Sequence, residues 1–143
     1  MKIIYKHETG IAVVHPTGEV PIETLILTAV PEQYRHTAYI VDDDMIPADR
    51  TFRDAWDFDK TAILINIDKA KEIHKDRLRA ERKSVLDDLD VQYIRKQEKG
   101  GDVTDIVSEK QRLRDITKLV DNCKTIDEIK QVTLNAKDRD TIL

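Results

Sequence analysis

The chain has 143 residues, of which 36% are charged and 5% aromatic, and its formal net charge is −4. The charged fraction is well above the usual quarter, so we expect a thin apolar core and a large solvated helical surface. Acidic and basic residues are interspersed, and the sequence therefore lacks the basic face that a dedicated nucleic-acid-binding protein needs. The single cysteine, Cys123, excludes an intrachain disulfide and is expected to be a small, half-buried residue.

Neither a targeting segment nor a membrane span is visible in the sequence. Residues 1–6 form a short strand-like run and lack the long apolar stretch of a signal peptide. The apolar runs elsewhere are far shorter than the roughly 20 residues that a membrane-spanning helix requires. We therefore expect a cytoplasmic protein that does not bind a membrane.

The start of the chain predicts a β-hairpin followed by a short helix. Two β-branched runs, residues 3–5 and 11–14, flank a turn in which Gly10 supplies a positive φ. Residues 21–29 then carry apolar side chains at i, i+3, i+4 and i+7, which predicts an amphipathic helix opened by a proline. A strand over residues 24–30 is the alternative.

Two further strands complete the head, which we expect to span residues 1–67. Residues 31–35 predict a loop, and residues 38–41 predict a third strand. Residues 61–67 form a continuous apolar run, which predicts a strand buried on both faces. This strand would be the last one of a small sheet and would lead directly into a long helix.

The segment before the last strand contains the only tryptophan. Residues 49–56 predict a short helical turn in which Phe52 and Trp56, four residues apart, share one face. In a structural role, Trp56 would anchor the core of the head, and Arg50 and Arg53 would form local ion pairs. Alternatively, these residues form a partner-binding spot, because Arg and Trp are enriched at interface hot spots.

Residues 68–120 predict an antiparallel helical hairpin. The first helix is expected to begin at an N-cap, Asp68, and Gly100-Gly101 then breaks it before a second helix starts. Both helices carry apolar side chains at helical spacing, so the two stripes are expected to face each other. The expected facing residues are Leu86, Leu89 and Tyr93 on the first helix, and Val103, Ile106 and Val107 on the second.

The first helix is expected to begin as a polar arm, residues 68–78. Acidic residues in the arm precede basic residues by three positions, and each such ion pair stabilises a helix by a few tenths of a kcal/mol. Its apolar residues are few, mainly Ala70 and Ile73, so this helix is expected either to bridge between parts of the protein or to have its apolar face completed by a helix of another chain. The arm, which includes Arg77, is therefore a predicted partner-binding surface and a reason to expect self-association or an oligomeric partner.

Residues 121–143 predict a short helix with a polar end. Thr125 is expected to cap this helix, and Glu128, three positions later, would complete a capping box. Residues 135–143 are polar and are expected to fray. The predicted fold class is α+β, with a small N-terminal β-containing head, a long-helix αα-hairpin and a short C-terminal helix. The predicted boundaries are 1–67, 68–120 and 121–143.

No motif points to catalysis, to a metal or to a cofactor. The four histidines are scattered without the spacing of a zinc site, and nucleotide-binding glycine motifs are missing. Asp42, Asp43 and Asp44 are adjacent, whereas a calcium loop needs ligands at alternate positions, a glycine and a final glutamate. We therefore expect a binding protein that is not an enzyme and holds no metal or cofactor. A hydrolase that uses these three carboxylates is the alternative.

The hairpin carries a resemblance to a known family. Its first helix contains Arg79-Ala80-Glu81-Arg82 followed by Leu86 and Asp90, and its second contains Lys110-Gln111-Arg112-Leu113-Arg114-Asp115-Ile116-Thr117. Over roughly residues 47–120 the chain resembles the C-terminal helical region of tail-fibre assembly and tail assembly chaperone proteins of tailed bacteriophages. The motif residues, which we expect to meet at the open end of the hairpin with Arg82 close to Asp115, are Arg79, Glu81, Arg82, Leu86, Leu113, Arg114 and Asp115.

The resemblance implies a phage tail-associated protein that binds tail or fibre subunits, as a structural adaptor of the virion or as an assembly chaperone. It implies no enzymatic activity and no cofactor. The protein would act in the host cytoplasm during assembly or, as an adaptor, in the virion tail. Its partners would be tail or tail-fibre proteins, without nucleic acid or membrane. A small regulatory binding protein unrelated to phages, acting through the hairpin, is the alternative. The residues expected to contact a partner are Arg50, Phe52, Arg53, Trp56, Ala70, Ile73 and Arg77.

Overall fold

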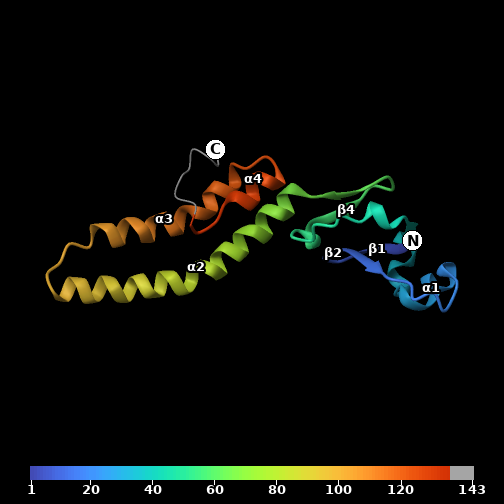
Figure 1. The fold of residues 1–143 in the computed structure, drawn as a ribbon, viewed down its shortest axis with the longest axis horizontal. Coiled ribbons are helices and arrows are strands. Elements are labelled where there is room, and N and C mark those ends of the chain that lie inside the picture. Colours follow the sequence, from blue (N-terminus) through green and yellow to red (C-terminus); the bar gives the residue numbers. More distant parts are fainter. Residues whose placement is uncertain (136–143) are drawn as a thin grey trace. The chain divides into compact units, whose positions relative to one another are not determined.

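The computed structural model describes residues 1–135 and has an α+β fold, as predicted. The chain divides into two compact units, Met1–Lys69 and a second unit that begins at Ala70. The first unit, called the head below, contains all the strands of the described residues, and the second contains the hairpin and the short C-terminal helix (Figure 1). The predicted polar end falls mostly on residues 136–143, which lie outside the described residues.

The head is built on a three-stranded antiparallel sheet. It contains β1 (Lys2–His7), β2 (Gly10–Val14) and β3 (Tyr39–Val41) in the order β2-β1-β3. Ile4 of β1 pairs with Val13 of β2. Gly10 is the first residue of β2 and has a φ of +147°, a conformation that disfavours residues other than glycine. The predicted hairpin and third strand are confirmed.

Helix α1 (Ile22–Ala29) follows β2, so the helical interpretation is confirmed and the strand alternative is wrong. Arg35 satisfies carbonyl groups at the C-terminal end of this helix. Its Nε donates to the Val30 oxygen at 3.1 Å and its Nη2 donates to the Leu27 oxygen at 2.6 Å. Arg35 belongs to a 3₁₀ helix, η1 (Glu32–Thr37), where a loop was predicted.

The head also contains a separate two-stranded ribbon, in which β4 (Trp56–Phe58) pairs antiparallel with β5 (Ile63–Ile65). The prediction that the strand after residue 60 is buried on both faces is wrong. Strand β5 pairs only with β4, and the side chain of Leu64 is 54% exposed on its outer face. A continuous apolar run therefore formed an edge strand with one buried face.

The turn of this ribbon is fixed by the carboxylate of Asp59. Its Oδ1 accepts hydrogen bonds from the Thr61 Oγ1 at 2.6 Å, the Thr61 amide at 2.9 Å and the Ala62 amide at 3.0 Å. These donors stabilise the ionised form, led by the Thr61 hydroxyl, and lower the pKa of Asp59 to about 2. The neighbouring Lys60 has a φ of +80°.

The sheet and the ribbon pack against each other around an apolar cluster. Its buried members come from both, and they are Ile4, Ile11, Val41, Trp56, Phe58 and Ile63. Successive side chains on a strand alternate between faces, so Ile4 and its partner Val13 point to the same side of the sheet. Ile3 points to the other side and is also fully buried.

Two short 3₁₀ helices, η2 (Asp43–Met45) and η3 (Arg53–Ala55), lie between β3 and β4. Trp56 begins β4 directly after η3, so the expected helical turn ends before it. The side chain of Asp49 accepts hydrogen bonds from the Thr51 amide and hydroxyl, at 3.0 and 2.6 Å. This local Asx-type turn competes with helix formation and explains why the helical turn is so short.

Helix α2 (Ile67–Glu98) is the longest element, and its N-cap is Asn66, not the predicted Asp68. The Oδ1 of Asn66 accepts a hydrogen bond from the Lys69 amide at 3.1 Å, which is the usual geometry of a cap with the third helical residue. Asp68 lies inside the first turn, where its negative charge is favourable next to the helix N-terminus.

At its other end, α2 stops in a Schellman motif formed by the two adjacent glycines. The Gly101 amide donates to the Lys96 oxygen at 2.9 Å, and the Gly100 amide donates to the Gln97 oxygen at 3.0 Å. Gly100 has a φ of +71°. A Cβ on Gly101 would lie 2.8 Å from the Cγ of Lys96. A side chain is therefore disfavoured at Gly100 by its backbone conformation and at Gly101 by the nearby side chain of Lys96.

We predict that Gly100→Ala lowers the free energy of unfolding by about 1 kcal/mol, since a Cβ disfavours this left-handed conformation. Gly100→Asn should lower it by less than half as much, because asparagine tolerates this conformation. Urea unfolding followed by circular dichroism measures both. Equal losses for the two variants would contradict the conformational explanation.

Helices α3 (Thr104–Asp121) and α4 (Ile126–Gln131) complete the second unit. The predicted cap of α4 is confirmed, since the Thr125 Oγ1 accepts from the Glu128 amide at 3.2 Å. The carboxylate of Glu128 reaches one residue further back than in a standard capping box. Its Oε2 accepts from the Lys124 amide at 2.6 Å.

Candidate functional site

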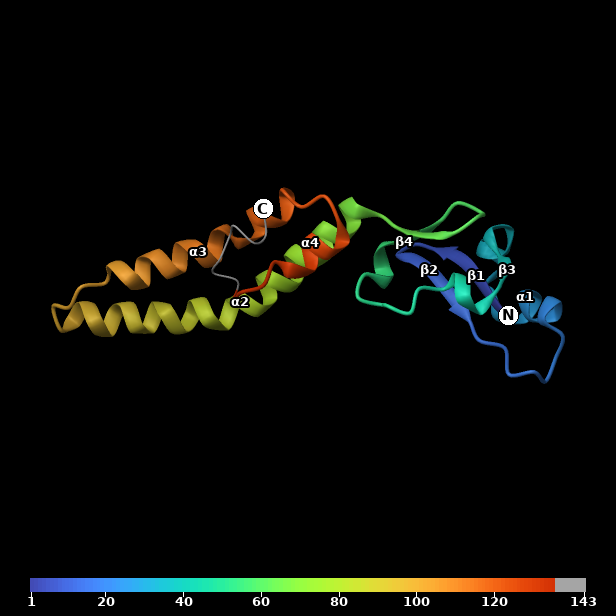
Figure 2. The ribbon, with the colours of Figure 1, turned by 45° about the horizontal axis from the view of Figure 1, so that its top comes forward.

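The polar arm of α2 is covered by the C-terminal part of its own chain. The Nε2 of His74 lies 2.7 Å from the carbonyl oxygen of Val132, and since a carbonyl only accepts, this nitrogen carries the proton. The Nζ of Lys71 donates to the main-chain carbonyl oxygen of Asp121 at 3.2 Å. Lys75 forms an ion pair with the carboxylate of the same residue. In both ribbon views α4 lies beside the N-terminal half of α2 (Figures 1 and 2).

These contacts show that the chain itself covers part of the arm, where the sequence predicted a helix of another chain. The arm supplies the buried residues Ala70 and Leu78, and α4 with the residue after it supplies Ile129 and Val132, all 2% exposed or less. Two of the expected ion pairs are present, Glu72 with Lys75 at 3.3 Å and Asp76 with Arg79 at 2.7 Å. Part of the apolar surface of the arm is therefore covered within the chain, while Ile73 stays half-buried.

The two motif segments meet between α2 and α3, and Arg82 bonds there to main-chain oxygens, where a contact with Asp115 was expected. The Nη1 of Arg82 donates to the main-chain oxygens of Leu113 and Arg114, both at 3.0 Å. Asp115 accepts a hydrogen bond from Gln111 at 3.0 Å and pairs with Lys118 at 3.0 Å. Leu113 is buried and Leu86 is half-buried. These motif residues therefore join the helices, while Arg79, Glu81 and Arg114 are exposed.

Closer to the turn, polar contacts replace apolar burial between the two helices. The Nζ of Lys110 pairs with the Asp90 carboxylate at 2.5 Å and lies 5.4 Å from the centre of the Tyr93 ring. Both arrangements are favourable for an ammonium group. Leu86, Leu89, Tyr93, Val103 and Ile106 are half-buried, as expected of facing residues. The prediction for Val107 is wrong, since it is 49% exposed.

The best-packed part of the second unit is therefore its base. The buried side chains of α3 and of the segment that follows it are Leu113, Ile116, Val120 and Cys123. The Sγ of Cys123 donates to the Leu119 oxygen at 3.3 Å, and burial raises the pKa of its thiol. A buried thiol with a raised pKa is a poor nucleophile.

The residues predicted to contact a partner are separated by burial into two groups. Phe52, Trp56 and Ala70 are buried, with no more than 1% of their surface exposed, so they present no surface to a partner. Arg50, Arg53 and Arg77 are exposed, and Ile73 is half-buried. Trp56 belongs to the apolar cluster of the head, which is the structural role that the sequence left open.

Exposed apolar side chains gather on the part of the hairpin that is far from its base. Three of them are Val91, Ile94 and Val107, at 44%, 55% and 49% exposure, and they flank the turn at Gly100-Gly101. Val91 and Ile94 are three residues apart and share one face of α2. This face is turned away from the half-buried Leu89 and Tyr93. The pattern of the sequence does not distinguish Val91 and Ile94, because only the burial of the seam shows which apolar positions remain outside it.

The described residues contain no grouping suited to hold a metal. Within residues 1–135, no three His, Cys, Asp or Glu side chains are placed together around a possible ion. Asp43 is engaged by cations, at 3.1 Å from the N-terminal amine and 3.7 Å from the Nζ of Lys2, and the hydrogen bond from that amine lowers its pKa. No helix in this part of the chain is long and apolar enough to cross a membrane.

No family model, no curated protein and no solved structure matches the chain.

Proposed function

We propose that this protein is a bacteriophage tail-associated protein that binds tail or tail-fibre subunits and performs no catalysis. The observation that carries the proposal is the exposed apolar face of the distal hairpin, at Val91 and Ile94. A helical face with adjacent apolar side chains is a common docking element for protein partners. The phage assignment rests on the motif resemblance around Arg79–Arg82 and Leu113–Ile116.

Packing is the proposed mechanism. The base of the hairpin is stabilised by its own buried residues and by the Arg82 contacts, so it holds the distal part of the two helices in place. The distal part, between Asp87 and Val107, has half-buried seam residues and exposed apolar ones. A tail or fibre subunit that covers Val91 and Ile94 would remove apolar surface from water, which favours binding by roughly 25 cal/mol per Å².

Replacing Val91 and Ile94 together with aspartate should weaken binding to the tail and fibre proteins at least tenfold, because two charges would be buried against the partner. Co-expression of the chain with these proteins, followed by co-purification and titration calorimetry, measures the loss. Thermal unfolding should stay unchanged within a few degrees, since surface substitutions have small effects on stability.

The matched control is Leu27→Asp, which changes a 63% exposed leucine on α1 of the head. It should bind as the wild type does. Equal weakening by both variants, or undiminished binding by the hairpin variant, would rule out this face as the docking surface. Quantifying the chain in purified virions separates the two roles: a stoichiometric amount supports a structural adaptor, and absence supports an assembly chaperone.

A further inference from the structure

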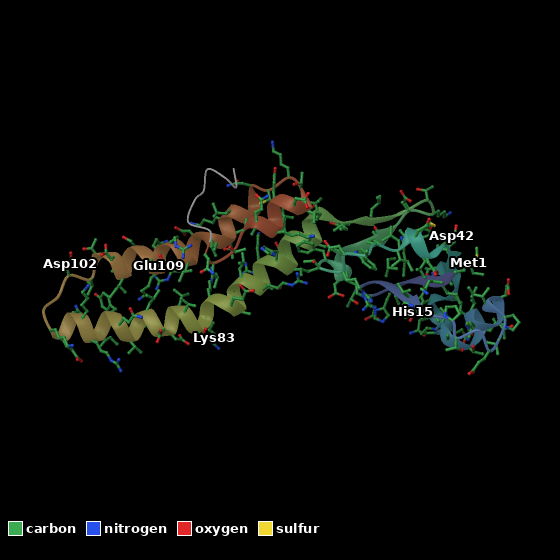
Figure 3. The ribbon with its side chains drawn as sticks, viewed as in Figure 1. Met1, His15, Asp42, Lys83, Asp102 and Glu109 are labelled. Carbon is green, nitrogen blue, oxygen red and sulfur yellow. The ribbon has the colours of Figure 1, made fainter. Side chains whose placement is uncertain are left out.

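A small pocket in the head has a basic rim and an apolar wall. Its volume is about 230 Å³. Its polar lining, called the rim below, consists of Lys2, His15, Asp43 and Arg50, and its apolar lining, the wall, consists of Val13, Ile46, Pro47 and Ala48. Figure 3 labels His15, on the segment that leaves β2. The three basic residues are far apart in the sequence and are brought to one opening by the fold.

Strand geometry explains why these residues meet. Lys2 and Ile4 are two residues apart on β1, Val13 pairs with Ile4, and His15 is two residues beyond Val13. Alternation therefore directs Lys2, Val13 and His15 to the sheet face that also carries the apolar cluster. Val13 and Ile46 pack against that cluster, so the wall of the pocket is continuous with the core of the head.

The charges around the pocket leave an excess of positive charge at its rim. Asp43 also lines it, but its carboxylate is already engaged by the N-terminal amine at 3.1 Å and by Lys2 at 3.7 Å. Among residues 1–135, the side chains of Arg50 and His15 show no hydrogen bond and no ion pair. An exposed guanidinium beside an apolar wall is well suited to a planar anion, because its paired N–H groups match a carboxylate.

We propose that this pocket binds the C-terminal residue of a protein partner, with an aliphatic side chain against the wall and the terminal carboxylate against Arg50 and Lys2. The volume is below the roughly 300–1,000 Å³ of pockets for drug-sized ligands, which restricts the occupant to about one residue. The inference concerns the head alone and does not depend on the docking face proposed for the hairpin.

Nuclear magnetic resonance of the ¹⁵N-labelled full chain tests the proposal. The first probe is 4-methylpentanoate, which has a carboxylate and a leucine-like aliphatic group. We expect saturable shifts of the amides of Val13, His15 and Ala48. The neutral 4-methylpentanamide and the small acetate ion should each bind at least tenfold more weakly. Equal binding of the amide, or shifts that do not saturate, would overturn the proposal, and so would inorganic phosphate binding as tightly as the acid.

Two variants and a peptide pair complete the test. Arg50→Gln should weaken binding of 4-methylpentanoate at least tenfold, whereas Lys124→Gln, at an exposed basic residue that does not line the pocket, should leave it unchanged. A peptide that ends in a free leucine should bind at least tenfold more tightly than the same peptide with an amidated end. Unaltered binding by Arg50→Gln, or equal binding of the two peptides, would refute the proposed occupant.

Discussion

Trp56→Ala is expected to lower the free energy of unfolding of the head by about 3–5 kcal/mol, the usual loss when a buried aromatic side chain is truncated to alanine. Trp56 is 1% exposed and joins the ribbon to the sheet through the cluster that contains Ile4 and Phe58. Since small domains are stable by only 5–15 kcal/mol, this loss should unfold a large fraction of the heads near physiological temperature. Hydrogen exchange of the β1 and β2 amides measures it.

Trp56→Phe is the matched control and should cost much less, about 1–2 kcal/mol. The indole Nε1 is buried and has no hydrogen-bond partner among residues 1–135. Replacement by phenylalanine removes this unsatisfied donor, whose burial costs about 1–3 kcal/mol, and so offsets part of the lost apolar contact. If both variants lose the same stability, the donor is not unsatisfied in solution and the apolar contacts of Trp56 matter less than the structure indicates.

Ile129→Ala is expected to lower the free energy of unfolding of the second unit by about 2–5 kcal/mol, because it opens a cavity beneath α4. Ile129 has no exposed surface, and α4 is a helix of 6 residues that is too short to be stable without packing. Faster hydrogen exchange should appear on α4 and also on the arm of α2, where His74 bonds to the Val132 oxygen.

The control for this variant is Val107→Ala, at a position that is 49% exposed, and its effect should stay within about 0.5 kcal/mol. The measurement also decides between two descriptions of the arm. If Ile129→Ala leaves hydrogen exchange on the arm unchanged, α4 does not protect it. That result would favour the prediction from sequence, in which another chain covers the arm.

Local sequence patterns predicted many elements of the fold because their causes are local. Alternating β-branched residues around Gly10 gave the β1-β2 hairpin, and apolar spacing gave α1. The Gly100-Gly101 pair stops α2 through hydrogen bonds to the turn just before it. Thr125 caps α4 through an amide three residues away. The predicted N-cap of α2 was wrong by two residues. Asn66 and Asp68 are both residues that cap helices well, and the sequence does not rank them.

The sequence predicted the candidate functional surfaces less well than the elements of the fold. Arg50 and Trp56 were considered together because they are close in the chain, yet the first lines a pocket rim and the second is buried. The alternation of Lys2 with Ile4, and of Val13 with His15, could have placed those basic residues on one sheet face. Nothing local places Arg50 beside them, because its position depends on how the loop after β3 returns to the sheet.

By itself, the sequence determined most of the strands and helices, although not β4, as well as where the turn of the hairpin lies and that the two motif-bearing helices meet. The tertiary structure decided which apolar faces are covered. It packed α4 against part of the arm, left Leu64, Val91 and Ile94 exposed, and placed Trp56 inside the head. The physical reason is that hydrogen bonds and backbone preferences act within a few residues. Burial depends on which distant segment packs against a face, and an apolar residue looks the same in the sequence whether its partner is its own chain or another.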